Sequence, residues 1–163
     1  MGSIIDFNQL KIPRWTGYEN TITAAEIHVF GDESEAAYGS VAYARLQKIN
    51  EDSYFVLLTS KKKVASLTKR KVSLPRLELL SSLLAVRLGE VVRKALHIQH
   101  WKVNYWSDSL VALGWIREEP NRWKPFVRNQ VDAIKASPRK NGGNIAQASK
   151  IQPILLRGER QRW

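Results

Sequence analysis

Short runs of apolar residues, many of them β-branched or aromatic, follow one another in the first third of the chain, with turn residues between them. This pattern predicts strands over 26–32, 38–46 and 53–60. The connections between these runs are short, which favours an antiparallel meander. A similar run predicts a fourth strand over 102–107.

Leucines and other apolar residues recur at steps of three and four after the third strand, which predicts a long amphipathic helix over about 75–96. Ser73 is a candidate N-cap for this helix. Shorter helices are predicted over 110–117 and 123–136. This order of elements predicts an α/β fold, in which helices pack on a mixed sheet.

Composition narrows the class of protein. The chain has 163 residues, of which 44% are apolar and 25% charged, so it can bury one hydrophobic core. It contains no cysteine, which excludes disulfides, cysteine–zinc sites and thiol catalysis. No run approaches the roughly 20 apolar residues that a membrane-spanning helix needs, so no membrane partner is expected.

Basic residues outnumber acidic ones. The chain has 26 Lys and Arg against 15 Asp and Glu, which gives a formal net charge of +11. A small domain with this balance usually binds a polyanion, and nucleic acid is the first candidate. The charge also fits a lysine-rich solvated surface, or a fragment whose acidic neighbour is missing.

Three carboxylates occupy special places. Asp32 ends the first strand, Glu78 lies in the first turn of the long helix, and Asp108 ends the fourth strand. Carboxylates that converge repel one another unless a cation lies between them, and all-oxygen ligands favour Mg²⁺ or Mn²⁺. Two such ions can cleave a phosphodiester. Each residue also has a structural explanation as a turn cap, a helix N-cap or a favourable charge at a helix start.

Four ordered blocks resemble one family. They are FGDESEAAYGSVAY (30–43), SLPRLELL (73–80), YWSDS with the apolar residues after it (105–116), and RWKPFV with the asparagine after it (122–129). Together they resemble the ribonuclease H-like domain of Bel/Pao-type LTR retrotransposon polyproteins. The resemblance covers about 12–136. It implies a ribonuclease H-like α/β fold, in which three antiparallel strands and a parallel fourth form a mixed sheet flanked by helices, with the first strand at the centre and the fourth beside it.

The resemblance implies a function and a metal site. Asp32, Glu78 and Asp108 match the first three acidic metal ligands of the ribonuclease H site. The family implies cleavage of the RNA strand of RNA–DNA hybrids with two Mg²⁺ or Mn²⁺ ions. It also implies a hybrid or duplex as partner, the reverse transcriptase domain of the parent polyprotein beside it, a monomer, and an intracellular location in a cytoplasmic particle or the nucleus.

Two basic groups would hold the nucleic-acid backbone on this reading, and their binding would weaken with salt. A basic loop over 61–71 forms the first group, and the predicted helix after residue 121 carries the second. A solvated surface is the alternative for both. The candidate residues are Lys61, Lys62, Lys63, Lys69, Arg70, Lys71, Arg122, Lys124 and Arg128.

The resemblance also implies three parts, and the last departs from the family. Residues 1–25 resemble the tail of the preceding reverse transcriptase region, 26–136 the ribonuclease H-like domain, and 137–163 an aberrant, basic and disordered tail. The family's last strand opens Trp-Arg-x-His and is followed by Asn-Pro-Ala-Asp-Leu, whose Asp is the fourth metal ligand. This chain has no acidic residue between Asp132 and Glu159, so the terminal strand and the fourth ligand are expected to be lost.

A frameshift accounts for this departure. Reading the codons from Asn141 onward from their third base, with allowed synonymous choices, gives both Trp-Arg-Gln-His and Asn-Pro-Ala-Asp-Leu. The leading hypothesis is therefore a ribonuclease H-like domain of a retroelement that ancestrally cleaved RNA–DNA hybrids and is weak or inactive in this form. The alternatives are a non-catalytic nucleic-acid-binding module and a non-functional retroelement remnant.

Overall fold

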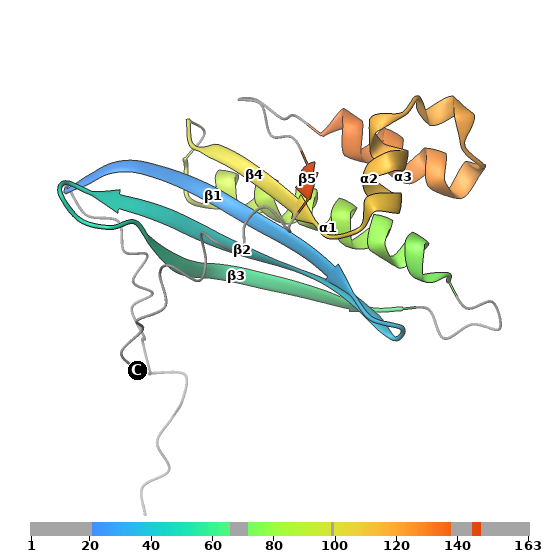
Figure 1. Ribbon diagram of the computed structural model, residues 1–163, viewed down its shortest axis with the longest axis horizontal. Helices are drawn as coiled ribbons and strands as arrows, with labels where there is room; N and C mark the ends of the chain where they lie inside the picture. The colour runs from blue at the N-terminus through green and yellow to red at the C-terminus, as the bar shows by residue number, and fades with distance from the viewer. Residues whose placement is uncertain (1–20, 66–71, 99, 138–144, 148–163) are drawn as a thin grey trace, which may run out of the picture.

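The computed structural model describes residues 21–65, 72–98, 100–137 and 145–147 (Figure 1). These residues form a five-stranded sheet with α-helices packed against it. The elements are, in chain order, β1 (Ile22–Glu33), β2 (Ala37–Lys48), β3 (Tyr54–Val64), α1 (Leu74–Ala95), β4 (Lys102–Ser107), α2 (Leu110–Arg117), a short 3₁₀ helix (Pro120–Arg122), α3 (Pro125–Ala136) and β5 (Ile145–Gln147).

The strand order is β3-β2-β1-β4-β5, which places β1 at the centre of the sheet. β1 pairs antiparallel with β2 and parallel with β4, and β2 pairs antiparallel with β3. The predicted fold class is confirmed, including the central first strand and the parallel fourth strand beside it.

The fifth strand corrects one prediction, because the sequence led us to expect that the terminal strand was lost. β5 has three residues and pairs parallel with β4, from Tyr105↔Ile145 to Ser107↔Gln147. A strand edge offers unpaired backbone groups that an extended segment of almost any sequence can satisfy. Ile145 also packs, partly buried, against the core. The family motif is therefore not needed for a short strand to form here.

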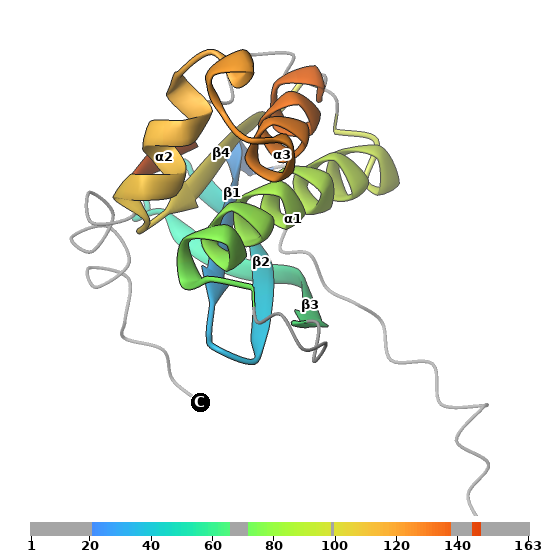
Figure 2. The same ribbon diagram turned by 90° about the vertical axis from the view of Figure 1, so that its right-hand side faces the viewer.

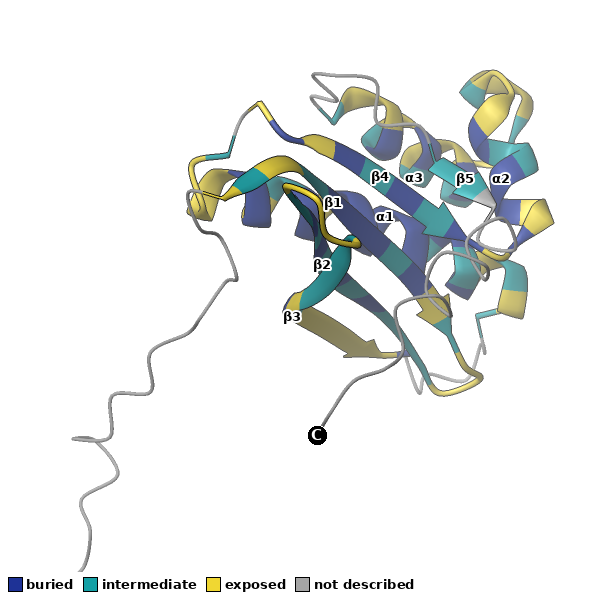
Figure 3. Ribbon diagram, turned by 60° about the vertical axis from the view of Figure 1, so that its left-hand side comes forward, coloured by how far each residue is buried: buried dark blue, intermediate teal, exposed yellow. Residues whose placement is uncertain are grey.

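The core lies between the sheet and α1. Ile27 and Val29 of β1 are completely buried, as are Ala42 and Leu46 of β2. In β2 they alternate with partly buried residues, as expected for a strand with one face against a helix layer (Figure 3), whereas in β1 the intervening His28 is buried as well. Burial of this apolar face supplies the main favourable free energy of folding.

Glycine lets α1 approach the sheet closely at two points. A Cβ at Gly31 of β1 would lie 2.8 Å from the backbone oxygen of Ser81 in α1. A Cβ at Gly89 of α1 would lie 2.8 Å from the buried ring of Tyr105 in β4. Both distances are shorter than a carbon can adopt without displacing its neighbour, so the position of α1 over β1 and β4 depends on these glycines.

The two shorter helices lie on the same side of the sheet as α1 (Figure 2). α3 packs against α1, and Val127, Val131 and Ile134 bury its apolar face in the common core. Ser109 is the N-cap of α2, and its side chain accepts a hydrogen bond from the backbone N–H of Ala112. No helix of the described part is long and apolar enough to cross a membrane.

Several element boundaries differ from the sequence-based expectation. β3 continues to Val64, so Lys61, Lys62 and Lys63 lie in a strand and not in a basic loop. β2 pairs with β3 along this segment, for example at Tyr38↔Lys63. The lysine run therefore has a strand backbone although its side chains are exposed. β1 begins at Ile22, four residues before the expected domain boundary. Residues 1–20 and the expected tail beyond 147 lie outside the described residues.

Replacing Gly31 by Ala should destabilise the fold. The new Cβ must displace backbone of α1, and overpacking of this kind costs about 1–3 kcal/mol. Gly114→Ala in α2 is the matched control, because a Cβ there meets nothing within 4 Å and alanine favours a helix by up to about 1 kcal/mol. Urea unfolding of both variants measures the difference. Equal stability for Gly31→Ala and Gly114→Ala would contradict the close approach.

Candidate metal centre

Three carboxylates converge beyond the carboxyl ends of β1 and β4. Asp32 and Glu33 come from the last two positions of β1, and Asp108 follows β4. One carboxylate oxygen from each of the three lies within 4.8 Å of the others. Asp32 and Asp108 are exposed and Glu33 is partly buried, so the group opens to solvent.

The strand register explains why these residues meet. β1 and β4 run parallel, and their last registered pair is Phe30↔Trp106. Asp32 and Asp108 each lie two residues beyond this pair, so both strands deliver a carboxylate at the same edge of the sheet. Ser109, and not Asp108, caps α2, which leaves the Asp108 side chain available to the cluster.

Glu78 lies beside the cluster but is held separately. It is the fifth residue of α1, just beyond the first turn in which the sequence placed it. Its Oε2 accepts a hydrogen bond of 2.5 Å from the Ser109 hydroxyl. The same hydroxyl oxygen accepts the Ala112 N–H, so Ser109 links the start of α2 to the Glu78 carboxylate.

Glu33 is a site residue that the sequence reasoning missed. Burial, followed by the nearby charges of Glu78, Asp108 and Asp32 in that order, raises the pKa of its carboxyl to about 7. Its Oε2 is buried and has no hydrogen-bond partner among the described residues. Strand alternation would direct Glu33 away from Asp32, and the sequence offered no other signal that both carboxylates meet at the strand end.

This donor set fits a hard divalent cation. It offers only carboxylate oxygens, which Mg²⁺ and Mn²⁺ prefer, and no imidazole or thiolate, which zinc prefers. A cation would relieve the mutual repulsion of the carboxylates and would give the buried Oε2 of Glu33 a partner. Asp32, Glu33 and Asp108 are the residues that could hold it directly, with Glu78 beside them.

The basic candidates lie in different surroundings. Lys61, Lys62 and Lys63 are exposed on β3, and register places only Lys62 on the sheet face of Asp32, through Asp32↔Gly39↔Lys62. Arg122 pairs with Glu118 and Arg128 with Asp132, whereas Lys124 is the exposed N-cap of α3. Lys69, Arg70 and Lys71 lie outside the described residues.

The aromatic residues near α3 pack against the hydrophobic core. Trp123 and Phe126 are partly buried against the core, and the Trp123 indole N–H donates to the carbonyl oxygen of Trp115 at 3.2 Å. The Arg76 guanidinium lies over the Phe126 ring, 5.0 Å from its centroid. These contacts account for the two side chains as structural residues.

Comparison with known proteins identifies a family. A family described as the Pao retrotransposon-like RNaseH-like domain matches residues 2–109, which end just after Asp108. No curated protein matches the chain. Among solved structures, the chain is similar to the foamy viral protease-reverse transcriptase in complex with RNA/DNA hybrid, with 10% identity and a TM-score of 0.42. That match covers 98% of this chain and 21% of the foamy viral chain.

The raised pKa of Glu33 predicts how stability depends on pH without metal. Between the ordinary value of 4.5 and about 7, the folded protein keeps a proton that the unfolded chain has released. The free energy of unfolding should therefore fall as pH rises through this window and level off above it. Urea unfolding in EDTA at several pH values measures this slope.

Glu33→Gln should flatten this slope, because the amide does not titrate. Glu35→Gln, which removes an exposed carboxylate from the turn after β1, is the charge-matched control and should keep the slope. An unchanged slope in Glu33→Gln would show that Glu33 is not the titrating group.

Proposed function

Because this chain belongs to the Pao retrotransposon-like RNase H-like domain family, we propose that it is a metal-dependent nuclease domain of a retroelement, built to cleave the RNA strand of RNA–DNA hybrids. The observation that carries this proposal is the convergence of Asp32, Glu33 and Asp108 beyond two parallel strands. A carboxylate cluster at the carboxyl end of a sheet is suited to phosphodiester chemistry because it can hold cations against a phosphate.

Different residues of the chain have different roles in the proposed reaction. Asp32, Glu33 and Asp108 hold Mg²⁺ or Mn²⁺, and Ser109 fixes the orientation of Glu78 beside them. Bound divalent ions would supply an activated water and stabilise the leaving oxygen. The exposed lysines of β3 and Lys124 contact backbone phosphates, which positions the duplex by shape and charge and not by base sequence.

We propose further that activity is weak in this form. The fourth acidic ligand of the family is absent, and the segment after Asn141 is explained by a shifted reading frame. Glu33 brings an additional carboxylate to the site from β1, which supports cation binding without restoring the ligand expected from the C-terminal segment. Looser ligand geometry lowers the rate of chemistry that depends on it.

A non-catalytic nucleic-acid-binding module is the second candidate. The net charge of +11 supports it, because phosphate neutralisation by Lys and Arg needs no metal centre. The two candidates differ in one result. A binding module retains an RNA–DNA hybrid without cutting it, whether or not the reading frame is restored.

Metal binding tests the centre directly. In calorimetric titration with Mn²⁺, Asp32→Asn and Glu33→Gln should each lower affinity by at least about tenfold, because each removes a charged ligand. Asp52→Asn is the matched control, since it removes an exposed carboxylate from the β2–β3 turn at the opposite end of β2 from Asp32. Equal affinities for all three variants and the unaltered chain would contradict the assignment.

Cleavage tests the proposed activity. The unaltered chain should cut a labelled RNA–DNA hybrid slowly or not at all in Mg²⁺, and restoring the frame after Asn141 should raise the rate by orders of magnitude. Asp32→Asn in the frame-restored chain should abolish the gain, because it removes a ligand common to both forms. Gel analysis of product gives the rates. Equal cleavage by both forms would show that the fourth ligand is dispensable.

A further inference from the structure

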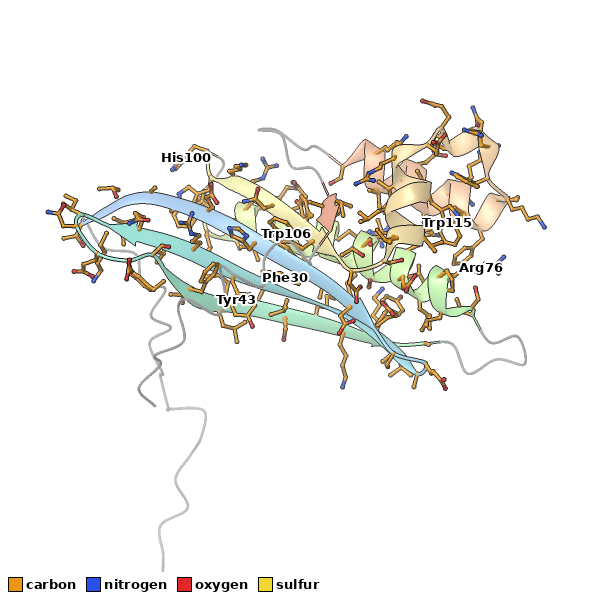
Figure 4. All side chains as sticks on the ribbon, viewed as in Figure 1. Phe30, Tyr43, Arg76, His100, Trp106 and Trp115 are labelled. Atoms are coloured by element: carbon orange, nitrogen blue, oxygen red, sulfur yellow. The ribbon has the colours of Figure 1, made fainter. Side chains whose placement is uncertain are left out.

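The sheet face opposite α1 carries a line of aromatic rings. Register places His28 and Phe30 of β1, Tyr43 of β2 and Trp106 of β4 on this face, while their neighbours Ile27 and Val29 face the helix. Phe30, Tyr43 and Trp106 are only partly buried. They follow one another across the sheet in Figure 4. The described helices pack on the other face.

Two of these rings form a flat, hydrogen-bonded pair. The Trp106 indole N–H donates to Nδ1 of His28 at 3.1 Å. The two ring planes differ by 2° and their centroids are 5.9 Å apart. The indole N–H lies in the plane of the Trp106 ring and points to Nδ1 of His28. Because the two ring planes are nearly parallel, the rings lie edge to edge. Phe30 continues this surface beside Trp106, with centroids 6.4 Å apart and planes 19° apart.

Perpendicular rings border this surface on two sides. Phe55 lies edge-on to His28, with planes at 73°, and Tyr43 lies edge-on to Phe30, with planes at 80°. The result is a group of three near-parallel rings bordered by two rings nearly perpendicular to them. We call the group His28, Phe30 and Trp106 the ring platform.

The polar atoms of the platform are already satisfied by neighbouring side chains on the same sheet face. Because Trp106 donates to Nδ1, the neutral His28 ring carries its proton on Nε2, which lies 3.3 Å from Oε2 of Glu26. The same carboxylate oxygen accepts from Asn104 at 3.4 Å and lies 3.9 Å from Arg45. Burial lowers the pKa of His28, which keeps the ring neutral. His28 itself is buried, so the platform offers a ligand the π surfaces of Phe30 and Trp106 and no unsatisfied hydrogen-bonding group.

Cationic residues border the same face. Register places Arg45, Lys62 and Lys102 on it, against the acidic residues Glu26 and Asp32. Gly39 is the only residue between Asp32 and Lys62 in their row, so no side chain separates them on the sheet. A nucleic-acid strand lying across this sheet face would thus contact first the ring platform, then Lys62 and then the metal centre.

We propose that this face binds single-stranded nucleic acid, with bases stacked on the ring platform and phosphates near Lys62 and Arg45. Base–aromatic stacking accepts any base, because every base has a π face, and is worth about tenfold in affinity per base. The rings and the basic border together favour this ligand over an apolar protein segment, which gains nothing from Lys62. The binding adds to the proposed nuclease activity and needs no metal.

Binding of the full chain to two 12-residue oligonucleotides in EDTA tests this proposal. One is oligothymidine and the other an abasic strand with the same phosphates, and fluorescence anisotropy gives both affinities. The unaltered chain should bind oligothymidine at least about tenfold more tightly. Equal affinities would overturn the proposal without any substitution. Because no metal or cleavage is involved, this result is independent of the proposed nuclease function.

Substitutions then locate the site. Trp106→Leu and Phe30→Leu each keep an apolar side chain but remove the ring, so each should abolish most of the preference for bases. The two residues lie on different strands, and circular dichroism verifies that each variant folds. Lys62→Ala should weaken binding to both oligonucleotides and flatten the salt dependence. Lys94→Ala, which removes an exposed lysine of α1 on the opposite side of the sheet, should change neither. A base preference that survives both leucine substitutions would overturn the proposal, because the bases would then bind elsewhere.

Discussion

The parallel pairing of β1 with β4 is the constraint on which both surfaces of this molecule depend. Its register runs from Glu26↔Lys102 to Phe30↔Trp106. This register determines which residue of β1 lies beside which residue of β4, both within the paired segment and just after its last pair. A slip of one residue would move one strand by about 3.3 Å and turn its side chains to the other face. The carboxylates would then no longer converge, and the aromatic rings would no longer lie side by side.

The carboxylate cluster is held against its own repulsion by packing. Burial and neighbouring charges raise the pKa of Glu33, so its ionised form is disfavoured in the folded protein. The close contact of Gly31 with Ser81 and the bond from Ser109 to Glu78 fix α1 and α2 around the cluster. The apolar layer beneath α1 therefore stabilises a site that is unfavourable until a cation enters it.

Periodicity predicted the strands and the long helix, because burial on one face leaves a regular pattern in sequence. The grouping of Asp32 with Asp108 came from the family resemblance and depended on the first and fourth strands being neighbours. The position of Glu33 could not be predicted, since alternation assigns it to the face opposite Asp32 and only the three-dimensional strand end brings their oxygens together. The distinction between Lys61 and Lys62 needed the register with β2. β5 was missed because its pairing depends on the open edge of β4 and not on a family motif.

The distance along the chain between β1 and β4 has a consequence for the order of folding. The β1–β2–β3 meander is closed by short turns, whereas β4 reaches β1 only after β2, β3 and all of α1 have been made. Long-range parallel contacts carry a larger loop-closure cost and form late. We therefore expect the meander and α1 to assemble first and the carboxylates to meet only at the final step. Acidic repulsion is thus absent from the folding nucleus and appears once the rest of the structure can oppose it.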